Sequence, residues 1–209
     1  PQPDHTLAAT APAKATHALR YVPTIGVENG LWSGEVVRDQ RPIDAWSLVY
    51  DTQPLEAHLE ILGMPRVLLN ASADAPLARW FVRVSDVAPD GTVTLTSWAG
   101  LNGAHRNSAE RPERLEPGRV YPLETELRFT SWTFPKGHRI RLSVNNAQWP
   151  MIWPTPHPMT TSLHLGGSHP THVVLPVVPH EDRPKPRFLP PSEDPRPAGH
   201  RVVSEGTSS

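Results

Sequence analysis

The sequence predicts an all-β fold, specifically a two-sheet β-sandwich of the jelly-roll type. Apolar and polar residues alternate with a period of two through most of the middle of the chain, which is typical of half-buried strands. No segment shows a convincing amphipathic helical pattern. Proline accounts for 26 of the 209 residues, about twice its usual ~5% frequency, which favours a loop-rich β protein. A jelly roll is the economical way to pack such strands in two sheets.

The strand candidates follow one another at short intervals. Alternation is clearest in five segments, residues 55–62, 80–85, 86–98, 120–129 and 138–144. In the second of them, Trp80, Val82 and Val84 face one way and the residues between them face the other. Further candidates lie at 44–50, 66–70, 161–165 and 172–178. Together these segments predict about nine short strands, enough for a jelly-roll sandwich.

Turn residues separate several of these strands. Pro89-Asp90-Gly91 divides the segment 86–98 into strand, turn and strand. Pro117-Gly118 precedes the segment 120–129, and Lys136-Gly137 precedes the segment 138–144. Proline and glycine at such positions are typical of tight turns.

Both ends of the chain differ in composition from its middle. Residues 1–20 are rich in Ala, Pro and Thr without an apolar period, so we expect a linker. Residues 179–209 form a Pro-rich segment of mixed charge that we expect to be a disordered linker or tail. The predicted domain is therefore 21–178. Since both ends resemble inter-domain connectors, the chain looks cut from a larger protein.

The charge and cysteine content exclude several classes of function. Twenty Lys and Arg residues balance 21 Asp and Glu residues, so no nucleic-acid or anionic-membrane surface is indicated. No apolar run approaches the ~20 residues of a membrane span, and no signal peptide stands at the first residue. Cysteine is absent, which excludes disulfides, thiolate catalysis and cysteine-based zinc sites. The compartment stays open, with the cytoplasm slightly favoured.

We find no constellation for catalysis. The chain contains no G-x-S-x-G nucleophile elbow, phosphate loop or dinucleotide fingerprint. His157, His164, His169 and His172 gather in the last third, as in a cupin metal site, but no H-x-H pair or nearby acid accompanies them. Solvated loop histidines are the better interpretation. We therefore expect no metal and no cofactor.

Two aspartates flank the turn at residues 87–91. Asp86 and Asp90 are candidates for chemistry only by their position, because turn aspartates that cap their own backbone explain them.

A proline-rich loop with two tryptophans is the strongest candidate for a binding surface. The stretch NNAQWPMIWPTPHP, residues 145–158, cannot be a helix interior or a central strand because it contains four prolines. Trp149 and Trp153 could stack on a sugar or a proline ring. They could instead cover an open end of the core, or pack on a neighbouring domain, since tryptophan is enriched at interfaces.

Several segments, taken in order, resemble one known family. They are SGEVVRDQR from Ser33, LVYDTQPLEAHLEILGMPRVLLNASAD from Leu48, VRVSDVAPDGTVTLTSWAGLNGAHRNS from Val82, LEPGRVYPLE from Leu115, FPKGHRIRLSV from Phe134 and WPMIWPTPHPMTTSLHLGGS from Trp149. The combination, over residues 20–178, is similar to the C-terminal domain of the cocaine esterase / X-prolyl dipeptidyl-peptidase family of α/β-hydrolases. Each motif alone would be weak, whereas their order is specific.

The resemblance implies a jelly roll of the galactose-binding-domain type without catalytic residues. In the family, the serine nucleophile, its acid and its histidine lie on an upstream α/β-hydrolase domain, which would be this chain's partner. The sandwich packs on the catalytic and cap domains, and it can wall the substrate pocket or join subunits in a homo-oligomer. The resemblance therefore favours Trp149, Trp153 and Trp32 as an interface or ligand surface.

The sequence leads to one main hypothesis and two rivals. We expect a non-catalytic β-sandwich domain whose parent enzyme hydrolyses esters or peptides through a serine outside this chain. A free-standing carbohydrate- or peptide-binding module, with Trp149 and Trp153 as its platform, is the alternative. A cupin-like metalloenzyme is a distant third.

Overall fold

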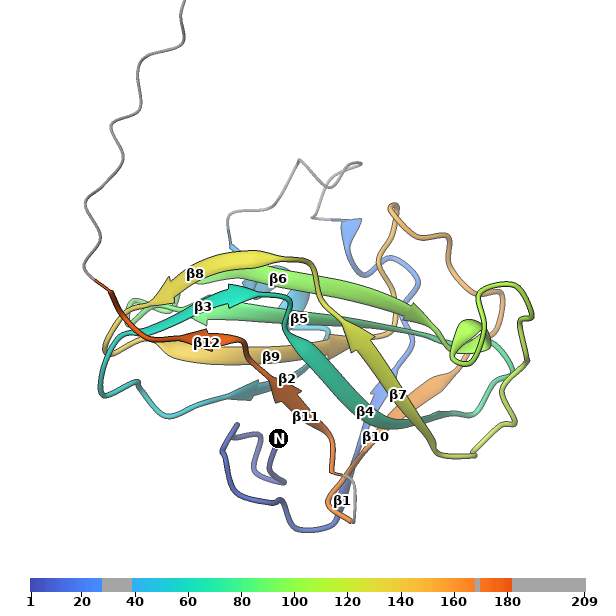
Figure 1. Ribbon diagram of the computed structural model, residues 1–209. Helices are drawn as coiled ribbons and strands as arrows, with labels where there is room; N and C mark the ends of the chain where they lie inside the picture. Colours follow the sequence, from blue (N-terminus) through green and yellow to red (C-terminus); the bar gives the residue numbers. More distant parts are fainter. Residues whose placement is uncertain (28–38, 168–169, 182–209) are drawn as a thin grey trace, which may run out of the picture.

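The computed structural model describes residues 1–27, 39–167 and 170–181 (Figure 1). Its strands form antiparallel sheets arranged in two layers around one core. Two short helical turns, α1 (Arg41–Asp44) and η2 (Gly103–His105), are the helices among the described residues. The prediction of an all-β fold is confirmed.

The first layer is a four-stranded sheet in the order β2-β9-β5-β6. Its strands are β2 (Leu48–Asp51), β9 (Arg139–Asn145), β5 (Arg79–Val87) and β6 (Val93–Asn102). The turn between β5 and β6 lies where the sequence predicts it. There the Gly91 amide donates to the Ala88 carbonyl over 2.9 Å, and the Thr92 amide donates to Asp90 Oδ1 over 2.9 Å. Gly91 adopts a φ of 87°, which glycine reaches without steric cost.

The second layer consists of two antiparallel sheets that follow one another across a bend (Figure 1). Its larger part has the order β1-β10-β4-β11, with β7 also paired to β4, and its smaller part has the order β12-β3-β8. The strands are β1 (Ala15–Arg20), β10 (Thr160–Leu165), β4 (Arg66–Ala73), β11 (His172–Val174), β7 (Tyr121–Glu126), β12 (Val177–Val178), β3 (Leu59–Gly63) and β8 (Thr130–Phe134).

Prolines mark the bend in this layer. Pro65 separates β3 from β4 and Pro176 separates β11 from β12, and neither has an N–H for the ladder. Their carbonyls still accept hydrogen bonds, from the Leu127 and Leu62 amides over 2.8 and 3.0 Å. The chain therefore continues from β3 into β4 and from β11 into β12 with a change of direction, and the layer curves around the core.

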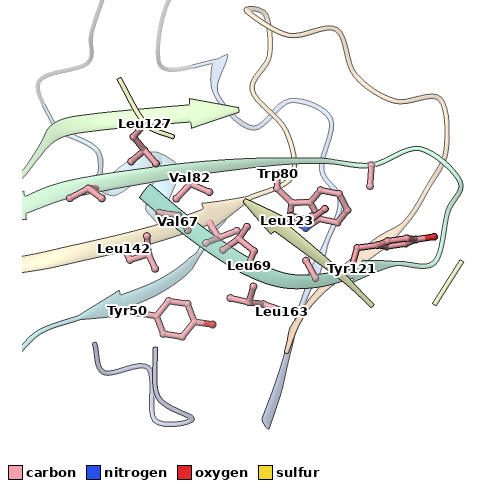
Figure 2. Close-up of a cluster of buried hydrophobic side chains, with 14 of the residues drawn as sticks. Tyr50, Val67, Leu69, Trp80, Val82, Tyr121, Leu123, Leu127, Leu142 and Leu163 are labelled. Carbon is pink, nitrogen blue, oxygen red and sulfur yellow. The ribbon is translucent and has the colours of Figure 1, made fainter. Parts of the chain in front are cut away.

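The core lies between the two layers (Figure 2). Side chains of the four-stranded sheet meet those of the bent layer, and the largest buried ones are Trp80, Tyr50, Phe134, Ile61, Leu69, Leu123, Leu127, Leu142, Leu163 and Val67. Burying each such side chain contributes about 1.5–3 kcal/mol. Trp80, Val82 and Val84 share this inner face, as the alternation in β5 predicts.

The outer face of β5 is buried as well, which the alternation did not predict. Phe81, Arg83 and Ser85 are all 3% exposed or less. The segment containing α1 covers this face of the sheet, because Asp44 on α1 bonds to Arg83 on β5 and Ser143 on β9. The outer face of β5 is therefore a second buried layer.

The N-terminal segment corrects the expected linker at 1–20. Residues 15–20 form β1, which pairs along its whole length with β10, from Ala15 opposite Leu165 to Arg20 opposite Thr160. Further upstream, Thr6 bridges to Asp51 at the edge of β2. The segment therefore belongs to the sandwich. Of the tail predicted at 179–209, residues 182–209 lie outside the described residues.

Candidate docking surface

The two-tryptophan loop follows β9 and is fixed to the sandwich at several points. The Trp149 amide donates to the Ile25 carbonyl over 2.8 Å. The Thr155 amide donates to the Tyr21 hydroxyl over 2.9 Å, and Arg79 donates to the Trp153 carbonyl. Burial of the Tyr21 phenol raises its pKa, so the group stays protonated and neutral at pH 7. Main-chain bonds of this kind give the loop one defined conformation.

A small apolar cluster supports the loop from below. Ile25, Ile43 and Ala147 form this cluster, apart from the main core. Gly26 allows the two segments to approach closely, because a Cβ there would lie 3.0 Å from the Gln148 Cα and the Trp149 carbonyl oxygen. The loop therefore rests on the segment that precedes α1.

The two indole rings differ strongly in exposure. Their centroids are 5.4 Å apart and their planes cross at 71°, an edge-to-face arrangement. Trp149 is half-buried, whereas Trp153 is 74% exposed, the largest exposed fraction among the described large apolar side chains. The hypothesis that both tryptophans cover an open end of the core does not fit such exposure of Trp153. Trp32, the third predicted residue, lies outside the described residues.

A buried charge network anchors the covering segment beside the loop. Asp44 Oδ1 accepts from Arg83 Nη2 and Ser143 Oγ, each over 2.8 Å, and Asp44 Oδ2 accepts from Arg141 Nη1 over 3.0 Å. Arg141 also binds Asp51 through two bonds of 2.7 Å. Burial lowers the pKa of Arg83, and the charge of Asp44 opposes that shift.

A hollow of about 510 Å³ opens next to the loop, along the end of β6. It shares Arg79, Phe81 and Ile152 with the underside of the loop. The sequence did not indicate this hollow, because the alternation in β5 separates Phe81 from Trp80 but does not show what covers its face. An aromatic residue at an outward position was the signal that could have indicated a covered surface.

Of the four predicted histidines, His157 lies in the two-tryptophan loop itself, whereas His164 and His172 lie on or beside β10 and β11 and have local partners. His164 Nε2 lies 2.9 Å from Ser72 Oγ, and the pKa of His164 is lowered by burial. His172 bonds to the Pro170 carbonyl, whereas His169 lies outside the described residues. The described residues contain no group of three or more metal-ligating side chains.

Asp86 corrects a sequence interpretation. Asp90 caps its own turn as expected, but Asp86 is 5% exposed and accepts from Trp132 Nε1 over 3.1 Å. Its other oxygen lies 2.8 Å from His138 Nδ1. Asp86 therefore joins strands within the sandwich and does not cap the turn.

No helix in the described part of the chain is long and apolar enough to cross a membrane.

Comparison with known proteins gives consistent matches. Residues 2–181 match the family model described as the X-Pro dipeptidyl-peptidase C-terminal non-catalytic domain. The chain is 28% identical over 156 residues to the cocaine esterase of Rhodococcus sp. (strain MB1 Bresler), an alignment that covers 67% of this chain. The chain thus spans 27% of the length of that esterase.

Solved structures share the fold. A selenomethionine-labelled α-amino acid ester hydrolase superposes with a TM-score of 0.73 at 23% identity, covering 85% of this chain and 35% of that one. An aminopeptidase from a marine sediment Thaumarchaeota archaeon gives 0.74 at 24% identity, covering 85% and 36%. Since the family model matches nearly the whole described fold, the chain belongs to the family of X-Pro dipeptidyl-peptidase C-terminal non-catalytic domains.

Proposed function

We propose that this domain packs on the catalytic domain of a serine hydrolase through the loop that carries Trp149 and Trp153. The observation that carries the proposal is Trp153, a residue that is 74% exposed although its main-chain carbonyl is held by Arg79. An exposed ring on a fixed loop suits contact with another protein surface, because little conformational entropy is lost on docking.

The geometry of the ring pair favours docking over sugar binding. A sugar ring stacks on the flat face of an indole, so a sugar platform presents its rings side by side and facing the solvent. The two rings here instead meet edge to face at 71°. Trp153 is the more exposed ring of this pair. Burying the exposed part of Trp153 would contribute about 2–3 kcal/mol, which is significant at a domain interface.

The parent enzyme would supply the chemistry. The family relationship supports hydrolysis of an ester or a peptide bond through an acyl-enzyme on a serine of the catalytic domain. The sandwich would hold that domain in place, help to wall its substrate pocket, and offer a surface for subunit contact. The isolated sandwich would be inactive.

The test compares Trp153→Ala in the full-length protein and in this chain alone. We expect the substitution to lower the thermal midpoint of the full-length protein and to increase proteolytic cleavage between its domains. In the chain alone the effect should be small because the ring contacts mainly solvent. Leu62→Ala is the matched control, since Leu62 is 50% exposed on β3 in the opposite layer.

Two outcomes would contradict the proposal. Unfolding of the isolated chain by Trp153→Ala, with the full-length protein unaffected, would make the loop a plug of the sandwich core. Saturable binding of an oligosaccharide that is lost in Trp153→Ala would support the carbohydrate-binding alternative.

A further inference from the structure

The end of β6 presents an open strand edge beside the loop. β6 pairs with β5, and no other described strand pairs with it. The Trp98 carbonyl accepts from the Arg128 amide over 3.2 Å, so the main-chain groups of Trp98 point away from β5. Because this direction alternates along an antiparallel strand, the main-chain groups of Gly100 and Asn102 point to the same open side.

Glycine keeps this edge accessible. A Cβ at position 100 would lie 2.7 Å from the Phe81 ring, so only glycine fits there. Gly100 is exposed, and the Phe81 ring forms the apolar floor beside it. A strand added at the edge can therefore lay its own side chain over the Phe81 ring without meeting one from position 100.

The charged side chains that line the hollow are all positive. Arg79 and Arg128 line it together with apolar, aromatic and amide side chains, and its described lining contains no carboxylate. Arg128 lies over the Trp98 ring at 4.2 Å, and neither arginine forms an ion pair with a described residue. Two guanidinium groups beside an apolar floor complement a segment with acidic and apolar side chains.

We propose that an extended acidic segment of the catalytic domain docks here as an added strand along β6. This inference rests on the proposed function. The amide and carbonyl of Gly100 and the amide of Asn102 pair with the segment's backbone, and its carboxylates bind Arg128 and Arg79. A second copy of this chain fits less well, because edge-to-edge pairing would bring like charges together.

The first test measures amide hydrogen exchange at residues 98–104 in the full-length protein and in this chain alone. We expect the Gly100 and Asn102 amides to exchange about tenfold or more slowly in the full-length protein, because an added strand protects them. Equal exchange in both would overturn the proposal. Protection in the chain alone that grows with its concentration would identify a second copy as the occupant and would also overturn it.

The second test separates the backbone contact from the charge contact in the full-length protein. Asn102→Pro removes the outward amide at a compatible φ of −83°, and Asn102→Ala controls for loss of the Asn102 Oδ1 bond to the Ala104 amide. Arg128→Glu reverses the charge, with Arg111→Glu as the exposed control. We expect proteolytic separation of the domains to be severalfold faster in Asn102→Pro than in Asn102→Ala, and faster in Arg128→Glu than in Arg111→Glu.

The Trp153→Ala result keeps the two proposals distinct. If Trp153→Ala loosens docking while Asn102→Pro and Arg128→Glu match their controls, the domain docks through the loop and the inference about β6 is wrong. If all three variants match their controls, both the inference about β6 and the proposed function are wrong. If Asn102→Pro and Arg128→Glu both loosen docking relative to their controls, an acidic strand docks on β6. The effect of Arg128→Glu should then disappear at high salt, because salt screens the charges.

Discussion

Asp44→Asn should destabilise this chain strongly because it leaves a buried arginine without its counter-charge. The Arg83 and Asp44 side chains are each 4% exposed, and their charged groups lie 2.8 Å apart. Two other nitrogens of Arg83, Nε and Nη1, have no hydrogen-bond partner among the described residues. Asp44 therefore provides the main compensation for burying this guanidinium.

These contacts indicate how much free energy of unfolding the variant should lose. Removing one partner of a buried ion pair costs about 3–5 kcal/mol, since the remaining charge stays buried. Arg141 should contribute less to the loss because it keeps its two bonds to Asp51. Against a typical total stability of about 5–15 kcal/mol, the variant should lose about a fifth or more of its free energy of unfolding.

Urea unfolding followed by tryptophan fluorescence measures this loss. Glu116→Gln is the control, because its ion pair with Arg119 is exposed at both side chains, and exposed ion pairs contribute little to stability. A loss in Asp44→Asn no larger than in Glu116→Gln would refute the reasoning. Adding Arg83→Met to Asp44→Asn should recover part of the stability, since it removes the unpaired charge.

Two further predictions concern acid sensitivity and catalysis. Burial lowers the pKa of His164 below its ordinary value of 6.5, so its contribution to stability should be complete above pH 6.5 and be lost as the pH falls from there through the lowered pKa. Between pH 7.5 and pH 5, the free energy of unfolding, measured with urea, should therefore fall less in His164→Gln than in the unmodified chain. His172→Gln, at an exposed position, is the control. An equal fall in His164→Gln and in the unmodified chain would contradict this prediction. The chain alone should not turn over nitrophenyl acetate above background, because it contains no nucleophile elbow. Saturable turnover that a serine-directed inhibitor abolishes would show this expectation to be wrong.

The sequence by itself determined the fold class and most strands and turns. Alternation in segments such as 80–85 and 138–144 reports which face is apolar, because successive side chains of a strand point to opposite sides. The turn at Asp90 and Gly91 depends on local backbone chemistry, which neighbouring residues specify. The family resemblance was also readable, because it depends on the order of short motifs.

Pairings between distant segments were decided only in the tertiary structure. Residues 15–20 resemble a linker, yet they form β1 because β10, more than a hundred residues away in sequence, offers them an edge. Asp86 resembles a turn residue, yet Trp132 on β8 and His138 beside β9 bind it. In both cases the decisive partner is remote in sequence, and no local pattern records it.

The candidate site divides in the same way. The loop and its tryptophans were predictable, since proline excludes regular structure locally. The exposure of Trp153, the burial of Arg83 by Asp44 and the hollow along β6 were not. Each depends on which segment covers the outer face of the four-stranded sheet. Alternation identifies the two faces of a strand, but only packing determines what, if anything, covers the second face.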